Sequence, residues 1–166
     1  MKILAMSDNH SSFADCIEII AKFHSTVDLF VHLGDGADSF EEAADVYDVK
    51  YYSVRGNCDL GNQPEELVFE AENKKFYACH GHYFKVGFSK IEYKKFIEEN
   101  KYDVGLFGHT HVPYLEEFAG RYIINPGSVS RSRSGDNSFC IIEIDGDNLK
   151  ADFYSSKSLE KIILPV

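Results

Sequence analysis

The chain lacks any apolar run long enough to cross a membrane, because a transmembrane helix needs about 18 or more apolar residues in succession. Its first residues, 1–8, become polar too early to hold the apolar centre of a signal peptide. No internal repeat, low-complexity tract or linker interrupts the 166 residues, a length that suits one domain with its own core. We therefore expect one domain over residues 1–166 of a soluble, cytoplasmic protein without membrane contact.

Cysteine is scarce and scattered. The four cysteines form no Cys-x-x-Cys pair, which argues against a disulfide framework and against a zinc cluster of thiolates. Cys16 lies in a helix-like run and Cys140 in a strand-like run, so we expect both as small core residues.

Positive charge is also in short supply. With 17 Lys and Arg against 27 Asp and Glu, the formal net charge is −10. A general nucleic-acid binder needs a basic surface to replace counterions, so that class of function is disfavoured. An acidic chain can still bind a phosphate locally, since two divalent cations held by only two carboxylates would leave a positive pocket.

Strand-like and helix-like runs alternate in the first half, and strands dominate the second. A cap by Asp38 and a capping box from Ser89 to Glu92 are expected at two helix starts. His24 follows a helix end and should be exposed, whereas His32 should be a hydrogen-bonded, partly buried histidine. The tail 162–164 should pack on the body. Predicted helices cover residues 13–23, 39–46 and 89–100; predicted strands cover 2–7, 27–33, 50–54, 66–71, 75–79, 102–107, 122–124, 139–144 and 149–154.

Five short polar segments follow apolar runs, as ligand sites do at the carboxyl ends of strands in α/β sheets. Each alone is explained well enough by a turn or a helix cap. Together they hold five of the seven histidines. Imidazole and carboxylate ligands without thiolates suit Mn²⁺, Fe²⁺, Zn²⁺ or Co²⁺. The segments are Asp8-Asn9-His10, Gly34-Asp35, Gly56-Asn57-Cys58-Asp59, His80-Gly81-His82 and Gly108-His109-Thr110-His111.

As a set, these segments resemble the signature blocks of the calcineurin-like metallophosphoesterases, and most of all their small single-domain phosphodiesterase branch from bacteria and archaea. Asn125-Pro126-Gly127-Ser128 adds a sixth block, and the resemblance runs in order from Asp8 to Arg133. It implies an α/β (α+β) fold, a four-layer αββα sandwich in which two facing mixed β-sheets are flanked by helices. The order of predicted elements is compatible with that fold.

The resemblance also implies a dinuclear site. Asp8, His10 and His111 would bind the first metal, Asp35 would bridge both, and the second would be bound by Asn57, His80 and His109. Mn²⁺ is the first expectation, with Ni²⁺, Zn²⁺, Fe²⁺ and Co²⁺ as alternatives. In such sites a metal-bridging hydroxide attacks phosphorus in line while the ions clamp the phosphate. Whether His82 is a ligand or a neighbour stays open here.

Two departures from the family pattern bear on the substrate. Cys58 stands where many relatives carry a histidine thought to protonate the leaving oxygen, and cysteine there is frequent in the phosphodiesterase branch. Ser132-Arg133 replaces a Pro-Arg pair. We expect Asn57, Cys58, Asp59 and His82 to take part in catalysis, and Ser128 and Arg133 to contact substrate. For Arg131 and Arg133, a phosphate contact and a plain loop charge are both open.

The leading hypothesis is thus a metal-dependent phosphodiesterase for small organic phosphodiesters. A phosphomonoesterase on the same site is one alternative. A protein-binding scaffold resembling a retromer subunit of eukaryotes is another, although that lineage has lost a key histidine and this chain has every expected ligand. The physiological substrate, the metal and the oligomeric state, including a homo-oligomer, are open at this point.

Overall fold

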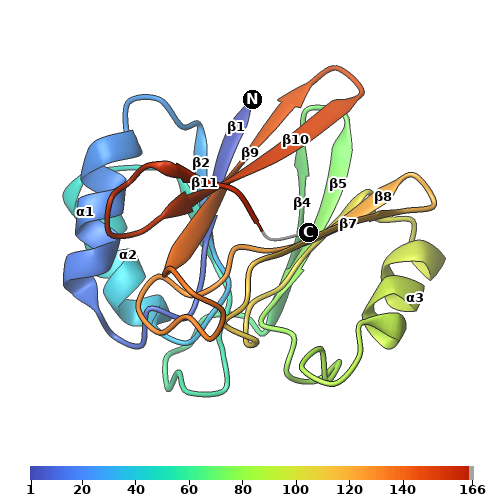
Figure 1. The fold of residues 1–166 in the computed structure, drawn as a ribbon, viewed down its shortest axis with the longest axis horizontal. Coiled ribbons are helices and arrows are strands. Elements are labelled where there is room, and N and C mark those ends of the chain that lie inside the picture. Colours follow the sequence, from blue (N-terminus) through green and yellow to red (C-terminus); the bar gives the residue numbers. More distant parts are fainter. Residues whose placement is uncertain (165–166) are drawn as a thin grey trace.

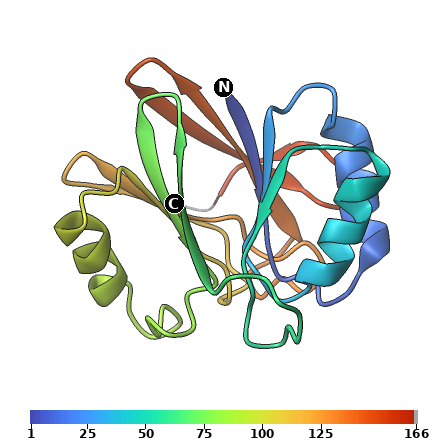
Figure 2. The ribbon, with the colours of Figure 1, turned by 180° about the vertical axis from the view of Figure 1, so that it is seen from behind.

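A computed structural model describes residues 1–164 of the protein. Two β-sheets face each other at the centre, with α1 (Phe13–Phe23) and α2 (Ala37–Val46) on one outer side and α3 (Ile91–Glu99) on the other (Figures 1 and 2). This is the predicted αββα sandwich, built from two mixed sheets.

The first sheet has six strands in the order β11-β10-β9-β1-β2-β3. Its centre is parallel: Ile3 of β1 lies opposite Leu29 of β2, while β9 pairs antiparallel to β1. The strands are β1 (Lys2–Met6), β2 (Leu29–His32), β3 (Tyr51–Ser53), β9 (Ser138–Asp145), β10 (Asn148–Ser155) and β11 (Lys161–Ile162).

The second sheet has five strands in the order β4-β5-β6-β8-β7. The hairpin β4–β5 and the edge strand β7 are antiparallel to their neighbours, while β5, β6 and β8 run parallel. The strands are β4 (Glu66–Ala71), β5 (Lys74–Cys79), β6 (Val104–Leu106), β7 (Tyr114–Phe118) and β8 (Arg121–Asn125).

The strand period of two divides the apolar residues among three cores. In β1, Ile3 and Ala5 belong to the core between the sheets, whereas Leu4 and Met6 pack beneath α1 and α2. A third core lies between the second sheet and α3, around Tyr93. Each central strand is therefore apolar on both faces, which explains the continuous apolar runs of the sequence.

The predicted helices agree with the structure in position, but the starts of two of them differ. The predicted 13–23 helix is confirmed as α1. The predicted cap by Asp38 is wrong: α2 begins earlier, and its N-cap is Gly36, at a φ of 131°. The N–H groups of Gly36 and Ala37 are bonded instead by the carboxylate of Asp59, from a distant loop.

At α3 the predicted capping box is also wrong. The N-cap is Lys90, and no side chain caps the helix. The Ser89 hydroxyl instead accepts a hydrogen bond from the Ile91 N–H at 3.2 Å, which closes a short turn one residue too early for a capping box.

Two strands escaped the sequence analysis. β7 is an edge strand whose residues are half-buried or exposed, and β11 has only two residues, so neither carries a run of apolar residues. In the tail, Ile162 and Leu164 pack against the central core as expected, but Ile163 is 93% exposed. Cys16 and Cys140 are confirmed as buried core residues.

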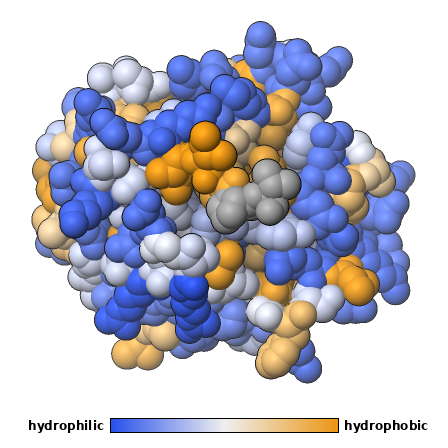
Figure 3. All heavy atoms as spheres, in the orientation of Figure 1, coloured by the Kyte–Doolittle hydropathy of each residue, from blue (hydrophilic) through white to orange (hydrophobic). Residues whose placement is uncertain are grey.

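The helices are short, and the surface is largely polar. Within residues 1–164, no helix combines the length and the apolar character that crossing a membrane requires. The face seen in Figure 3 is mostly hydrophilic, and its hydrophobic residues form small separate patches.

Candidate metal centre

The candidate site lies where parallel strands of both sheets end. β1, β2 and β3 lead into the segments around Asp8, Asp35 and Asn57, and β5 and β6 lead into those around His80 and His109. These loops meet at one edge of the sandwich, on its lower side in Figure 1. The fold thus brings together segments that are up to about a hundred residues apart in the sequence, and five of the seven predicted ligands line one pocket.

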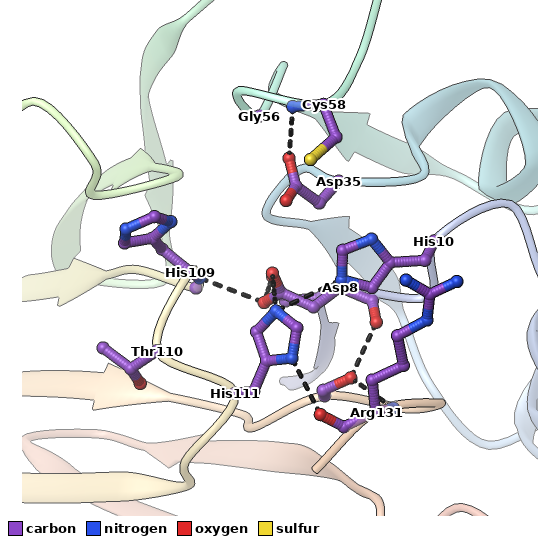
Figure 4. Close-up of polar contacts among 12 residues, drawn as sticks. Asp8, His10, Asp35, Gly56, Cys58, His109, Thr110, His111 and Arg131 are labelled. Atoms are coloured by element: carbon purple, nitrogen blue, oxygen red, sulfur yellow. Dashed lines mark hydrogen bonds and ion pairs between the residues drawn. The ribbon is translucent and has the colours of Figure 1, made fainter. Parts of the chain in front are cut away.

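One group of ligand atoms is formed by Asp8, His10 and His111 (Figure 4). Asp8 Oδ1 lies 3.2 Å from His111 Nε2, and the Nε2 atoms of His10 and His111 are 3.2 Å apart. Two ring nitrogens and a carboxylate oxygen that converge in this way offer three lone pairs to one point.

A second group is formed by Asp8, Asp35 and His80, all of them buried. Asp35 Oδ1 lies 3.4 Å from His80 Nε2 and accepts a hydrogen bond from the Cys58 N–H at 2.8 Å. Asp35 also forms a third group with His10 and Cys58. Its carboxylate therefore lies between the two halves of the site.

Hydrogen bonds at Nδ1 of two histidines leave their Nε2 atoms able to bind a metal. Nδ1 of His80 lies 2.7 Å from the carbonyl oxygen of Leu33, and Nδ1 of His111 lies 2.7 Å from that of Arg131. A carbonyl only accepts, so each Nδ1 carries the proton and each Nε2 of the neutral ring is a free acceptor.

Two buried atoms give independent support for a bound cation. Asp8 Oδ1 and His80 Nε2 have no hydrogen-bond partner among the described residues. Leaving a buried polar atom unpaired costs about 1–3 kcal/mol, and a divalent ion would satisfy both atoms. The donor set of imidazoles and carboxylates therefore fits divalent metals of the transition series.

The two carboxylates of the site favour the charged form of the histidines that they contact, whereas burial lowers the pKa of His10, His82 and His109. Burial lowers the pKa of His80, but Asp35 and Asp8 outweigh it and the pKa is raised. The Asp8 carboxylate beside His111 raises the pKa of His111 despite partial burial. Burial would raise the pKa of Asp35, yet His80 and the Cys58 N–H hold it well below its usual range. The contacts with Asp8 and Asp35 therefore favour positive charge at His80 and His111.

The backbone of the site is strained in a consistent way. Five of the predicted ligands have a positive φ, between 45° and 67°, which non-glycine residues rarely adopt. Such conformations cost about 1–3 kcal/mol each and persist where the surroundings impose them, as at binding sites. These residues are Asp8, His10, Asp35, His109 and His111.

The remaining predicted ligands lie at the rim. The His109 N–H donates to Asp8 Oδ2 at 3.0 Å, and its ring lines the pocket with a centroid 5.1 Å from that of His80. Asn57 is exposed, lines the same pocket and donates to the Cys58 sulfur at 3.3 Å. His82 is half-buried, with its ring centroid 5.5 Å from that of His80, and lies outside the three groups.

The two predicted substrate contacts, Ser128 and Arg133, lie in different places. Ser128 is fully buried beneath the pocket: its hydroxyl donates to the Asp8 carbonyl at 2.7 Å and accepts from the Arg131 N–H. It supports the loop that carries Asp8. Arg133 and Arg131, by contrast, line the pocket, and Arg131 extends alongside His10 in Figure 4.

Three supporting residues were given no role in the sequence analysis. The Ser7 hydroxyl donates to Asp8 Oδ2 at 2.6 Å, and the Asn125 amide donates to the Gly108 carbonyl at 2.7 Å. His32, expected to be partly buried, is fully buried; its Nε2 lies 2.9 Å from Asn9 Oδ1 and burial lowers its pKa to about 4. Of these three residues, Asn125 could have been noticed from the sequence, because it belongs to the sixth block.

Asp59 holds the second and third loops of the site together. Its Oδ2 accepts from the N–H of Asp35 at 2.7 Å and of Gly56 at 2.8 Å, and its Oδ1 from those of Gly36 at 2.6 Å and Ala37 at 3.1 Å. Four backbone donors converge on one carboxylate. Asp59 therefore positions the backbone that carries Asp35.

Asp59→Asn should lower the free energy of unfolding of the metal-free protein by about 2–4 kcal/mol, because an amide NH₂ would face two of those donors. Urea unfolding followed by circular dichroism measures it. Asp38→Asn is the matched control, since Asp38 is exposed and, within residues 1–164, accepts a hydrogen bond only from the side chain of Gln63. Equal effects of the two changes would contradict this role for Asp59.

Comparisons with known proteins agree with this geometry. Residues 1–147 match the sequence model of the Calcineurin-like phosphoesterase superfamily domain. The "Probable metallophosphoesterase YsnB" of Bacillus subtilis (strain 168) is 32% identical over 96% of this chain and 94% of its own length. The "Phosphodiesterase YfcE" of Escherichia coli (strain K12) is 28% identical over 81% of this chain and 83% of its own.

The fold is shared with solved structures. A crystal structure of a predicted phosphoesterase from Streptococcus pneumoniae TIGR4 superposes with a TM-score of 0.83 at 29% identity, covering 94% of this chain and 90% of that one. The family match, the relatives and the convergent carboxylates and imidazoles lead to one assignment. The chain belongs to the calcineurin-like phosphoesterase superfamily, in its small bacterial and archaeal branch, and is a metal-binding hydrolase of phosphoric esters.

Proposed function

We propose that the chain is a single-domain phosphodiesterase that hydrolyses small organic phosphodiesters at a dinuclear metal site. The observation that carries the proposal is that ligand atoms converge in more than one group: Asp8 with His10 and His111, and Asp8 and Asp35 with His80. In these groups Asp8 Oδ1 and His80 Nε2 are buried without a hydrogen-bond partner among the described residues. A single ion would leave one of the two groups of ligands without a use.

The residues divide naturally between two ions, for which Mn²⁺ is the first candidate. Asp8, His10 and His111 would hold one ion, and His80, His109 and Asn57 the other, with Asp35 shared. When bound, the ions supply Lewis acidity toward the phosphate oxygens and make a water molecule acidic enough to attack phosphorus.

The chain's own residues would bind and orient the substrate. Arg131 and Arg133 line the pocket and favour an anionic phosphate there. The carbonyls of Leu33 and Arg131 fix the orientation of two imidazoles. Asn57, exposed at the pocket, can donate to a phosphate oxygen.

The chemistry of Cys58 favours a diester as the substrate over a monoester. Its neighbour Asp35, together with partial burial, raises the pKa of the thiol to about 11. In either protonation state a thiol has no cationic form. A monoester dianion brings more negative charge than a diester and depends more on a cationic proton donor. The name of the Escherichia coli relative, a phosphodiesterase, points the same way.

Metal loading tests this proposal. We expect two Mn²⁺ per chain by elemental analysis after loading and desalting, and a lower stoichiometry in His80→Ala, because His80 Nε2 is a buried donor. His24→Ala is the matched control, since His24 is exposed at the end of α1. A reproducible stoichiometry near zero would end the metalloenzyme hypothesis.

A panel of aryl esters separates the alternatives on the loaded protein. Faster turnover of diesters than of monoesters supports the proposal. The reverse order would establish the phosphomonoesterase alternative. Full metal loading without hydrolysis of any ester in the panel would favour the protein-binding scaffold.

A further inference from the structure

A second pocket opens beside the metal pocket and shares two of its walls. We call it the side pocket: a cavity of about 240 Å³ lined by Lys90, Val112 and Tyr114, and by His109 and Arg133, which also line the metal pocket. A phosphate held among the metal ligands therefore has one ester group within reach of this cavity. None of the family blocks includes Lys90, Val112 or Tyr114.

The side pocket combines an apolar wall with positive charge. Lys90 Nζ lies 4.7 Å from the centre of the Tyr114 ring, a cation–π contact that holds the ammonium at the pocket wall. Arg133 is exposed at the boundary of the two pockets. Among the described residues, neither Lys90 nor Arg133 forms an ion pair.

Among the described residues, the carboxylate of Glu116 forms an ion pair with Lys94 and with neither of these two cations. Glu116 accepts from Lys94 Nζ at 2.8 Å and from the Tyr114 hydroxyl at 2.6 Å. These two bonds, with a smaller effect of Lys90, lower the pKa of Glu116. Glu116 is thus a charged partner of Lys94, and the Lys90 ammonium is left for a ligand. Two free cations at one cavity are conspicuous in a chain with a net charge of −10.

We propose that the side pocket selects substrates in which one ester group carries a negative charge of its own, a carboxylate or a further phosphate. Lys90 would bind that charge, and the ring of Tyr114 with Val112 would contact the carbon atoms of the group. This inference rests on the proposed phosphodiesterase activity and names its substrate class. It makes Lys90 a residue that determines specificity and leaves the reacting atoms to the metal pocket.

Two matched diesters test it: 4-nitrophenyl phenyl phosphate, and the same compound with a carboxylate at the para position of the phenyl ring. Loss of each diester is followed by chromatography on the Mn²⁺-loaded protein. We expect wild type to prefer the carboxylate compound. Lys90→Gln should lower kcat/KM for it by about fivefold, the factor that corresponds to about 1 kcal/mol for an exposed charge pair. The neutral compound should change by less than about twofold.

Lys85→Gln is the matched control, because Lys85 is an exposed lysine of the same loop that does not line the side pocket. It should leave the preference unchanged. The preference of wild type should also shrink with added salt, which screens exposed charges. An equal effect of Lys90→Gln on both compounds, or no preference in wild type, overturns the inference while the phosphodiesterase proposal stands. Absence of hydrolysis of both compounds by loaded wild type overturns the phosphodiesterase proposal and this inference with it.

Discussion

Asp35→Asn should reduce kcat/KM for aryl phosphodiesters by about 10³-fold or more, because on the proposed dinuclear site it removes a charge shared between the two ions. The Asp35 carboxylate lies 3.4 Å from His80 Nε2 and belongs to two of the three groups of ligand atoms. An asparagine has the same shape, and its carbonyl oxygen can still accept the Cys58 N–H. The fold should therefore survive while both ions bind more weakly.

His82→Gln serves as the comparison, because it changes a histidine near the site that is not expected to bind metal. His82 is a half-buried neighbour of His80 outside the three groups, so its loss should cost about 10–100-fold at most, as for residues that support metal ligands. Elemental analysis and kcat/KM are measured on both variants, with circular dichroism to check folding. Comparable losses of metal and activity in the two folded variants would mean that the roles of the histidines are misassigned.

The elements that the sequence predicted well are those with a strong local period. α1 carries apolar residues on one face over eleven residues, and β1 is apolar on both faces because it lies between two cores. The site segments could be found because Gly, His and Asp gather where apolar runs end. β7 was missed because an edge strand that is half exposed needs no apolar run.

What the sequence could not predict depends on contacts between distant segments. The start of α2 is fixed by Asp59, twenty-two residues beyond Ala37, so a local capping rule chose Asp38 instead. Ser128 was expected in the pocket, yet a hydroxyl that bonds the Asp8 carbonyl lies below it. The positive φ of His109 has no local signal either, because the surrounding loops impose it.

Contacts between distant segments also determine the surroundings of residues at the rim of the pocket. Cys58 lies beside Asp35 because its own N–H donates to that carboxylate, and the proximity raises the pKa of the thiol. Lys90 meets Tyr114 across the gap between α3 and β7. On the proposed function, the metal ligands would define the reaction class, and residues on the rim would decide which ester is accepted.

Cys58→His should raise kcat/KM for an aryl monoester by much more than for the matched diester, changing their ratio by about tenfold or more. The thiol is neutral, whereas a histidine with an ordinary pKa near 6.5 has a cationic form that can balance the second negative charge of a monoester and protonate its leaving oxygen. General acid catalysis supplies about 10²–10⁴-fold when the geometry is right, and Cys58 lines the pocket beside the metal ligands. Diesters with good leaving groups need that proton least, because the departing oxygen is a weak base. Cys58→Ser is the matched control, since a hydroxyl of similar size has no cationic form and should leave the ratio unchanged. A fixed ratio in folded, metal-loaded Cys58→His would show that the residue at position 58 does not set the preference for diesters.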